Sequence, residues 1–300
     1  MEGKPRCRLP LYLQLQLLLL LLHHKVAESY NPSIGMRMAY VEKAVYCGRE
    51  SFEAWDVGDS CTLGPQVNSS QLRFVTNDHT QAAAGVGKML EPTGCFVGVR
   101  GTQGDISSLL DATFWWTPFG RSSCDGCQVD FGFKTAYESI ADGVFQALAD
   151  FGCQEVPLYL VGHSQGAAVL HFMLYDAIEK HFQVEMMYAL EAPRPGNSAF
   201  GNALRSVAKD VDAWRVAHYQ DVVVHLPPQE LFAYSHALPE IYYTAESGTE
   251  YKECGVEDTS CSGQWWPWQW STKDHTWYAD INPCTCAKQS STLHLSEFVV

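Results

Sequence analysis

A serine between two glycines is the residue of this chain best suited to covalent chemistry. Gly162, Ser164 and Gly166 form a G-x-S-x-G pattern in the segment GHSQG. The pattern is typical of a nucleophile elbow, in which a strand turns sharply into a helix and exposes the serine. Glycines are needed where the turn has no room for side chains. Since the pattern also occurs by chance in surface loops, the neighbouring residues decide its meaning.

The residues on both sides of the pattern favour an elbow. Residues 156–161 form a short apolar run, which is typical of a buried parallel strand. After Gly166, the segment AAVLHFMLYDAIEKHF has apolar residues at helical spacing and ends in charged ones. The sequence therefore predicts a strand, an exposed Ser164 and a helix, and it predicts that Ser164 acts as a nucleophile.

A serine hydroxyl needs partners to become a good nucleophile. These partners are a histidine base, an acid that orients the histidine, and donors for the oxyanion. In enzymes with such an elbow, the acid and then the histidine follow the serine along the chain. The candidates are Asp210, Asp212 and Asp221 for the acid and His218, His225, His236, His275 and His294 for the base. Asp221 follows a predicted strand, where sheet enzymes place catalytic groups, but spacing alone does not choose among the histidines.

Strands and helices alternate along the chain that must position these residues. Helices are expected at residues 36–45 and 136–151, and further strands at residues 95–99, 185–190, 214–218 and 240–244. This alternation predicts an α/β fold with a mostly parallel central sheet that has helices on both faces. Because no repeat or linker divides the chain, we expect a single catalytic domain over residues 30–300.

The first 29 residues have the composition of a targeting segment. Lys4, Arg6 and Arg8 precede a leucine-rich stretch, which predicts a signal peptide at residues 1–29. The stretch is short for a membrane span and contains Gln14 and Gln16, and no later segment is long and apolar enough to cross a bilayer. We therefore expect a secreted, extracellular protein without an integral membrane span.

The cysteines and the charge agree with that location. Ten of the eleven cysteines follow residue 29, and an even number in an exported chain predicts disulfide bonds. Asn68 begins a glycosylation sequon, Asn-Ser-Ser. The formal net charge of −14 argues against nucleic acids and anionic membrane surfaces as partners.

Six segments of the chain resemble, in order, those of the fungal-type (class 3) triacylglycerol lipases of the α/β-hydrolase superfamily. They are CFVGVRGT, VDFGFKTAY, LVGHSQGAA, EAPRPGNSAF, HYQDVVVHLPP and DHTWY. The resemblance runs from about residue 37 to residue 286. It implies an α/β-hydrolase fold and hydrolysis of carboxylic esters by serine chemistry, which requires no metal or other cofactor.

The resemblance also implies roles for particular residues. The segment HYQDVVVHLPP is similar to the acid-bearing segment of the family, which implies that Asp221 is the acid. The segment DHTWY is similar to the one with the catalytic histidine, so His275 is the expected base and His236 a structural residue. The segment RGT implies Thr102 as one oxyanion donor. The backbone N–H of Gln165, directly after the nucleophile, is the expected second donor.

Residues 104–112 fall where the family has its lid, a short helix over the active site. Ile106, Leu109 and Leu110 would form the apolar face of that lid and meet a lipid surface. The competing interpretation is an ordinary surface helix that packs its apolar side on the core.

Four tryptophans precede the expected base. Trp265, Trp266, Trp268 and Trp270 surround a proline. Tryptophans in such a loop could contact lipid, stack on sugar rings or shape an acyl groove. The alternative is that two or three of them are buried against the loop of His275.

The resemblance also implies pairs of cysteines, and the sequence departs from the family at Glu191. It implies a Cys124–Cys127 bridge, a Cys254–Cys261 bridge and a bond from Cys47 to Cys284 or Cys286. Cys95 and Cys153 either pair or stay as buried thiols. Glu191 stands where the family has glycine in its TFGxPRxG element, a departure that bears on specificity.

These observations predict a secreted serine carboxylester hydrolase, a lipase that hydrolyses triacylglycerol, with an ester lipid as its substrate. The alternatives within the same chemistry are a feruloyl or other soluble-ester esterase and a phospholipase A1. A different class is an inactive relative that binds glycans or lipids. The segment GVGK at residues 85–88 resembles the end of a phosphate-binding loop, but Ala82 and Met89 lack the required residue types, so we exclude that function.

Overall fold

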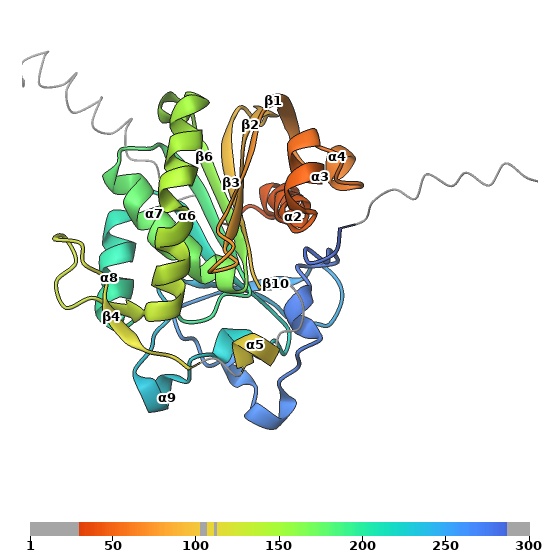
Figure 1. Cartoon of the computed structure of the whole chain (residues 1–300). Helices are drawn as coiled ribbons and strands as arrows, with labels where there is room; N and C mark the ends of the chain where they lie inside the picture. Colours follow the sequence, from red (N-terminus) through yellow and green to blue (C-terminus); the bar gives the residue numbers. More distant parts are fainter. Residues whose placement is uncertain (1–29, 103–106, 111–112, 287–300) are drawn as a thin grey trace, which may run out of the picture.

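An eight-stranded sheet forms the centre of the protein (Figure 1). The computed structural model describes residues 30–102, 107–110 and 113–286. The strands of the sheet are, in chain order, β1 (Gln66–Thr76), β2 (Ala83–Glu91), β3 (Gly94–Arg100), β6 (Leu158–His163), β7 (Val184–Leu190), β8 (Asp212–His218), β9 (Glu240–Tyr243) and β10 (Tyr251–Cys254). Strands β3, β6, β7, β8 and β9 are neighbours in parallel pairs, whereas β1, β2 and β10 are added antiparallel at the edges. The predicted mostly parallel α/β fold is confirmed.

Helices cover both faces of this sheet. On one face lie α2 (Pro32–Tyr46), α3 (Gly48–Ala54) and α4 (Ser60–Leu63), and on the other lie α6 (Phe131–Asp150), α7 (Gln165–Glu179) and α8 (Ser198–Val207) (Figure 1). The short elements are α5 (Ser107–Leu110), α9 (Gln229–Phe232), the small hairpin of β4 (Trp116–Pro118) and β5 (Gln128–Asp130), and the 3₁₀ turns η1 (Cys153–Glu155), η2 (Val223–His225), η3 (Ser262–Gln264), η4 (Pro267–Gln269) and η5 (Asp274–Thr276). None of the helices in the described ranges has the length and apolar composition needed to span a bilayer.

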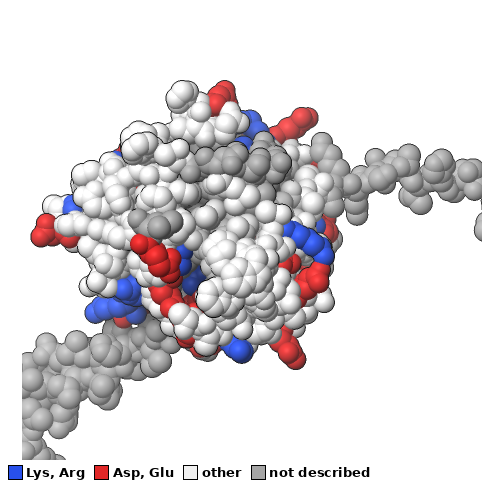
Figure 2. Space-filling model, turned by 90° about the horizontal axis from the view of Figure 1, so that it is seen from below, with Lys and Arg blue, Asp and Glu red and all other residues white. Residues whose placement is uncertain are grey.

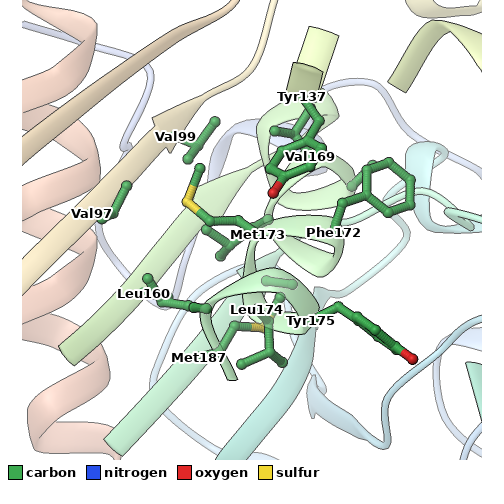
Figure 3. Packing of buried hydrophobic residues seen from close by; sticks show 14 of the residues in the cluster. Val97, Val99, Tyr137, Leu160, Val169, Phe172, Met173, Leu174, Tyr175 and Met187 are labelled. Carbon is green, nitrogen blue, oxygen red and sulfur yellow. The ribbon is translucent and has the colours of Figure 1, made fainter. Parts of the chain in front are cut away.

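The central strands are buried on both faces, which explains their continuous apolar sequences. Every residue of β3 and β6 is buried. Because successive side chains of a strand point to opposite faces, Val97 and Leu160 pack towards α7, whereas Phe96 and Val161 pack in the second core on the α2 side. Figure 3 shows the first of these cores, in which Met173 of α7 points to Val97 and Val99 of β3 and Phe172 points away from the sheet.

The predicted elements all occur, but the antiparallel edge strands were missed. Strand β1 is an edge strand with mostly polar residues, QVNSSQLRFVT, so it lacks a clear alternating pattern. Strand β2 contains the GVGK segment, which therefore lies in a strand and not in a phosphate-binding loop. A Cβ atom at Gly85 would lie 2.4 Å from the Phe52 ring, so this glycine makes room for an aromatic side chain of α3.

Four disulfide bonds join eight of the ten described cysteines, and one of them decides between the two partners predicted for Cys47. The bonds are Cys47–Cys286, Cys95–Cys153, Cys124–Cys127 and Cys254–Cys261. Cys284 does not pair with Cys47, because the Cα atom of Cys286 lies 4.9 Å from that of Cys47, within disulfide range. The thiol of Cys284 instead points to His163, with Sγ 3.6 Å from Nδ1.

Some predicted features lie outside the described residues. They are the signal peptide at residues 1–29, the lid residue Ile106 and the histidine His294. Asn68 is half-buried on β1, where its side-chain amide donates to Gln71 Oε1 over 2.8 Å and its carbonyl oxygen accepts from the Ser70 hydroxyl.

Candidate active site

Ser164 sits in a strained turn between β6 and α7. Its backbone angles are φ 57° and ψ −129°, a conformation that non-glycine residues rarely adopt. The turn is fixed by a hydrogen bond from the Ser164 N–H to the Leu190 carbonyl oxygen, 2.9 Å long. A Cβ atom at Gly166 would lie 2.0 Å from the carbonyl oxygen of Val99, so only glycine lets the helix start this close to β3. The structure therefore has the predicted strand, turn and helix.

The structure brings Ser164, His275 and Asp221 into one hydrogen-bonded line. The Ser164 hydroxyl donates to His275 Nε2 over 2.8 Å. His275 Nδ1 donates to the Asp221 carboxylate, with distances of 3.0 and 3.1 Å to its two oxygens. All three side chains are buried. This arrangement matches the requirements for a nucleophile, a base and an orienting acid.

Loop contacts at the end of β8 place the acid and the base. Asp221 lies three residues beyond β8 and accepts a hydrogen bond from the Val223 N–H over 2.8 Å. The segment before His275 pairs with this loop, because the Ser271 N–H donates to the Gln220 carbonyl oxygen. His218 at the end of β8 donates from Nδ1 to the Asp274 carbonyl oxygen, 3.1 Å away. These contacts hold His275 opposite Asp221 although 54 residues separate them.

The surroundings of His275 keep its imidazole neutral. Burial lowers the pKa of His275 below its usual 6.5, and the Asp221 carboxylate only partly offsets this shift. A neutral imidazole with Nδ1 protonated has a free lone pair on Nε2, which is the atom that faces Ser164. His275 can therefore accept the serine proton at neutral pH.

Thr102 and Gln165, the expected oxyanion donors, contact each other. Thr102 follows β3 closely, and Gln165 is the first residue of α7. The Thr102 hydroxyl donates to Gln165 Oε1 over 3.1 Å, so the two residues are in direct contact beside Ser164. Their position agrees with the expected oxyanion hole, and their role in catalysis stays a prediction.

The competing acids and histidines have other contacts. Asp212 lies at the opposite end of β8 and accepts from the Trp214 indole, while Asp210 is exposed. His236 Nε2 donates to the Val224 carbonyl oxygen, and burial lowers the pKa of His236 well below 6.5. His225 stacks on Trp270 with ring centres 4.2 Å apart. None of these contacts involves Ser164.

A second histidine, His163, lies beside His275, with ring centres 4.8 Å apart. His163 Nε2 donates to the carbonyl oxygen of His275 over 2.8 Å, and its Nδ1 is hydrogen-bonded to the Tyr46 hydroxyl, also over 2.8 Å. Glu191 is fully buried, and its Oε2 lies 2.7 Å from His163 Nε2. Tyr46 was not singled out from the sequence, and Glu191 was noted only because the family has glycine at that position. This departure from glycine was the sequence signal that could have identified Glu191 as a residue of the site.

The predicted lid is described only in part. Helix α5 covers Ser107–Leu110. Leu109 is buried and joins the core that also contains Phe133, whereas Leu110 is exposed. The described part therefore has one apolar side chain in the core and one at the surface.

Two of the four tryptophans are exposed and two are held by the protein. Trp266 and Trp268 are 61% and 77% exposed and stack on each other with ring centres 5.2 Å apart. Trp265 donates to the Tyr242 hydroxyl, and Trp270 donates to the Trp265 carbonyl oxygen. The prediction of exposed tryptophans thus applies to Trp266 and Trp268, and the alternative of tryptophans packed against the protein applies to Trp265 and Trp270.

The tryptophan segment borders a cavity and an uncharged surface. A cavity of about 350 Å³ is lined by Trp265, Trp266 and Trp270 together with Arg215 and His236, and the three residues of the hydrogen-bonded line are not among its lining. Figure 2 views the end of the molecule with α5 and α9 and shows a mostly uncharged middle, with charged side chains at the rim and in a small hollow.

Metal binding finds little support among the described residues. His163, Glu191 and His275 offer ligand atoms within 4.8 Å of one another, but His275 is already engaged by Ser164 and Asp221. A second group, Cys254, Asp258 and Cys261, includes two cysteines that form a disulfide bond.

The chain is similar in sequence to known lipases. The sequence model described as "Lipase (class 3)" matches residues 96–231. The chain is 29% identical over 174 residues to the secreted mono- and diacylglycerol lipase A of Penicillium cyclopium, covering 57% of this chain and 52% of the relative. It is 27% identical over 197 residues to a lipase of Rhizopus niveus, covering 62% of this chain and 48% of the relative. The chain thus spans about half the length of these curated relatives.

A solved structure has the same fold. The lipase from Rhizopus microsporus var. chinensis superposes with a TM-score of 0.72 at 23% identity, and the match covers 86% of this chain and 91% of that protein. At this identity the likeness concerns the fold, which is the α/β-hydrolase fold with its elbow after a central strand.

Proposed function

Since the chain belongs to the class 3 lipase family, we propose that it is a secreted carboxylester hydrolase that cleaves acylglycerols through Ser164, His275 and Asp221. The single observation that carries the proposal is the hydrogen-bonded line from the Ser164 hydroxyl through His275 to Asp221. A serine in an ordinary surface turn has no such partners.

The proposed mechanism follows from the contacts. His275 Nε2 takes the hydroxyl proton as Ser164 Oγ attacks the ester carbonyl carbon, and Asp221 stabilises the imidazolium that forms. The backbone N–H groups of Thr102 and Gln165 would stabilise the oxyanion, a contribution of about 3 kcal/mol per donor. His275 then protonates the leaving alcohol, and water attacks the acyl-serine by the reverse proton transfers.

The choice of a lipid ester rests on the exposed apolar side chains near the same end of the molecule. Besides Leu110, the exposed large apolar residues include Trp115, Trp116, Phe131, Phe232, Trp266 and Trp268. Trp115 precedes β4, and the N–H of Phe131, the first residue of α6, donates to the Trp115 carbonyl oxygen. The others belong to α5, β4, α9 and the tryptophan segment, which Figure 1 places around the lower end. A surface with such residues and little charge favours contact with a lipid phase over a dilute soluble substrate.

Two related proposals concern the location and organisation of the protein. The secreted relatives and the predicted signal peptide at residues 1–29 support export. We also propose that residues 30–300 form a single catalytic domain, since both cores of the described part share one sheet. Glycosylation at Asn68 remains part of the proposal.

Hydrolysis rates on triolein, tributyrin, phosphatidylcholine and methyl ferulate test the function. We expect the acylglycerols to be cleaved fastest, with a rise in rate when tributyrin passes from solution to emulsion. Preference for methyl ferulate would favour the esterase, and preference for phosphatidylcholine a phospholipase A1.

Labelling with a fluorophosphonate probe tests the nucleophile independently of substrate. We expect labelling of the folded protein and none of Ser164→Ala. A folded protein that neither reacts with the probe nor cleaves any of the four esters would contradict the enzyme proposal and favour a binding protein.

A further inference from the structure

Glu191 occupies a backbone position that suits glycine better than glutamate. It directly follows β7 and has φ 51°, in the left-handed region. Its N–H donates to the Val216 carbonyl oxygen of β8 over 2.7 Å, so its backbone is fixed between the two strands. The lipase motif resembled here has glycine at this point. A strained residue beside a candidate active site points to a use for its side chain.

The carboxyl group of Glu191 is directed at the two neighbouring histidines. It is fully buried, and Oε2 lies 2.7 Å from His163 Nε2. Ligand atoms of His163, Glu191 and His275 all lie within 4.8 Å of one another. Among the described residues, neither carboxyl oxygen of Glu191 has a donor in line for a hydrogen bond. The group therefore has unused hydrogen-bonding capacity close to a ring nitrogen of His275.

Asp221 approaches His275 from the end of the next strand. Asp221 follows β8, whereas Glu191 follows β7, and these strands are parallel neighbours. Two buried carboxyl groups that act on each other electrostatically cannot both ionise at low cost. Asp221 accepts hydrogen bonds from the Val223 N–H and from His275, which stabilise its carboxylate, whereas Glu191 has no such donor among the described residues. Burial, together with Asp221 and Asp274, raises the pKa of Glu191 well above its usual range.

We propose that Glu191 is a second acid for His275, which orients and stabilises the histidine when the charge of Asp221 is absent. Loss of the Asp221 charge lets Glu191 release its proton to water. Rotation of the flexible side chain then brings a carboxylate oxygen to hydrogen-bond distance from the imidazole. No other bond changes. The inference rests on the proposed function of the triad, and it extends that function by one residue.

A double-mutant cycle on a soluble ester, p-nitrophenyl butyrate, tests the proposal. Glu191→Gln keeps the shape but not the acid, and Asp221→Ala removes the first acid and leaves space. We expect Glu191→Gln alone to lower kcat about threefold. Asp221→Ala alone should lower it about 10³-fold, less than the roughly 10⁴-fold loss seen when a triad acid is replaced without a substitute. The double variant should lose at least a further 30-fold relative to Asp221→Ala.

The coupling between the two sites separates a second acid from a structural residue. A merely structural Glu191 would lower kcat by the same factor in both backgrounds, and that outcome, with unchanged circular dichroism, overturns the proposal. Glu42→Gln is the matched control, since Glu42 is also fully buried on the α2 side of the same histidine cluster. We expect its effect to be the same with and without Asp221. Added formate should raise the activity of the double variant more than that of Asp221→Ala.

A measurement without substrate keeps the inference separate from the proposed function. The pKa of His275 can be followed by NMR in the four proteins of the cycle. We expect the double variant to have a His275 pKa about one unit below that of Asp221→Ala, because the remaining carboxylate is lost. Equal values in these two proteins would overturn the inference. Failure of the wild-type protein to cleave any ester would overturn the proposed function but leave this comparison intact.

Discussion

Two histidine–carboxylate pairs lie side by side in this protein, with the ring centres of their histidines 4.8 Å apart. The two pairs differ in the hydrogen bonds of the ring nitrogens. In the pair His275–Asp221, Nδ1 faces the carboxylate and Nε2 accepts from the Ser164 hydroxyl. In the pair His163–Glu191, Nε2 is near the carboxyl group and donates to the His275 backbone, while Nδ1 is hydrogen-bonded to the Tyr46 hydroxyl. Only the first pair has a basic nitrogen directed at a reacting hydroxyl. Contact between a histidine and an acid therefore does not define a catalytic pair; the partner of the other ring nitrogen does.

Removal of each histidine should give the largest difference between the pairs. We expect His275→Ala to lower kcat/KM by about 10⁴-fold, because no other group accepts the serine proton. His163→Ala should lower it about tenfold, because it removes the hydrogen bond to the His275 carbonyl oxygen but not the group that accepts the serine proton. The rates are measured on p-nitrophenyl butyrate with folding checked by circular dichroism. Equal losses in both variants would break the distinction between the pairs.

The pH dependence of activity should follow the ionisation of His275 in the first pair. His163 in the second pair should shift the pH at which this ionisation occurs. Only neutral His275 can accept a proton, so kcat/KM should fall about tenfold per pH unit once the pH drops below the pKa of His275. Burial places that pKa below 6.5, so activity should be flat from pH 8 to about pH 6.5 and decline at lower pH. His163 contributes to the lowering, so His163→Ala should move the midpoint to higher pH. A wild-type midpoint above pH 7 would contradict this account.

The change of the protein's thermal stability with pH should reflect the ionisation of Glu191 in the second pair. The pKa of Glu191 is raised in the folded state because the group is buried near Asp221 and Asp274. The unfolded chain releases this proton near pH 4.5, so ionisation favours unfolding as the pH rises from 4.5 towards the folded-state pKa. Glu191→Gln lacks this term, and its Tm relative to wild type should increase by a few degrees between pH 5 and pH 8. A Tm difference that is constant over this range would mean that Glu191 is ionised in the folded protein.

The smallest effect should come from a thiol that touches only the second pair. Cys284 Sγ lies 3.6 Å from His163 Nδ1 and has no disulfide partner. We expect Cys284→Ser to change kcat/KM less than about twofold, and to lower the number of titratable thiols in the unfolded, unreduced protein by one. Loss of a disulfide in this variant, seen by peptide mapping, would show that Cys284 rather than Cys286 pairs with Cys47.

The parallel core and the nucleophile turn could be read from the sequence because their signals are local. The strand before Ser164, the tight glycines and the apolar helix after it all lie within residues 156–181. The base and the acid could not be chosen from spacing, since they depend on how the loops after β8 and before η5 pair in space. The resemblance to a known family supplied that choice.

The edge strands and the second histidine pair could not be predicted for physical reasons. Strand β1 is polar because it has a neighbour on only one side, so it shows no buried pattern. The contact between His163 and Glu191 joins the ends of two different strands, and no local pattern records it. Whether Cys284 or Cys286 pairs with Cys47 depends on how the backbone of these residues runs past α2. The two cysteines are only two positions apart, so the sequence does not show which one comes close enough.

The bond between Cys47 and Cys286 closes residues 47–286 into a covalent ring. It joins positions 239 residues apart, one next to α2 and the other beyond His275. In the chain-entropy view a loop of this size stabilises the folded state by about 5 kcal/mol. The ring also changes what a protease can achieve. A single cut in the exposed segment at residues 245–250 would open the ring and create new ends, yet the piece with His275 would remain covalently attached to the piece with Ser164.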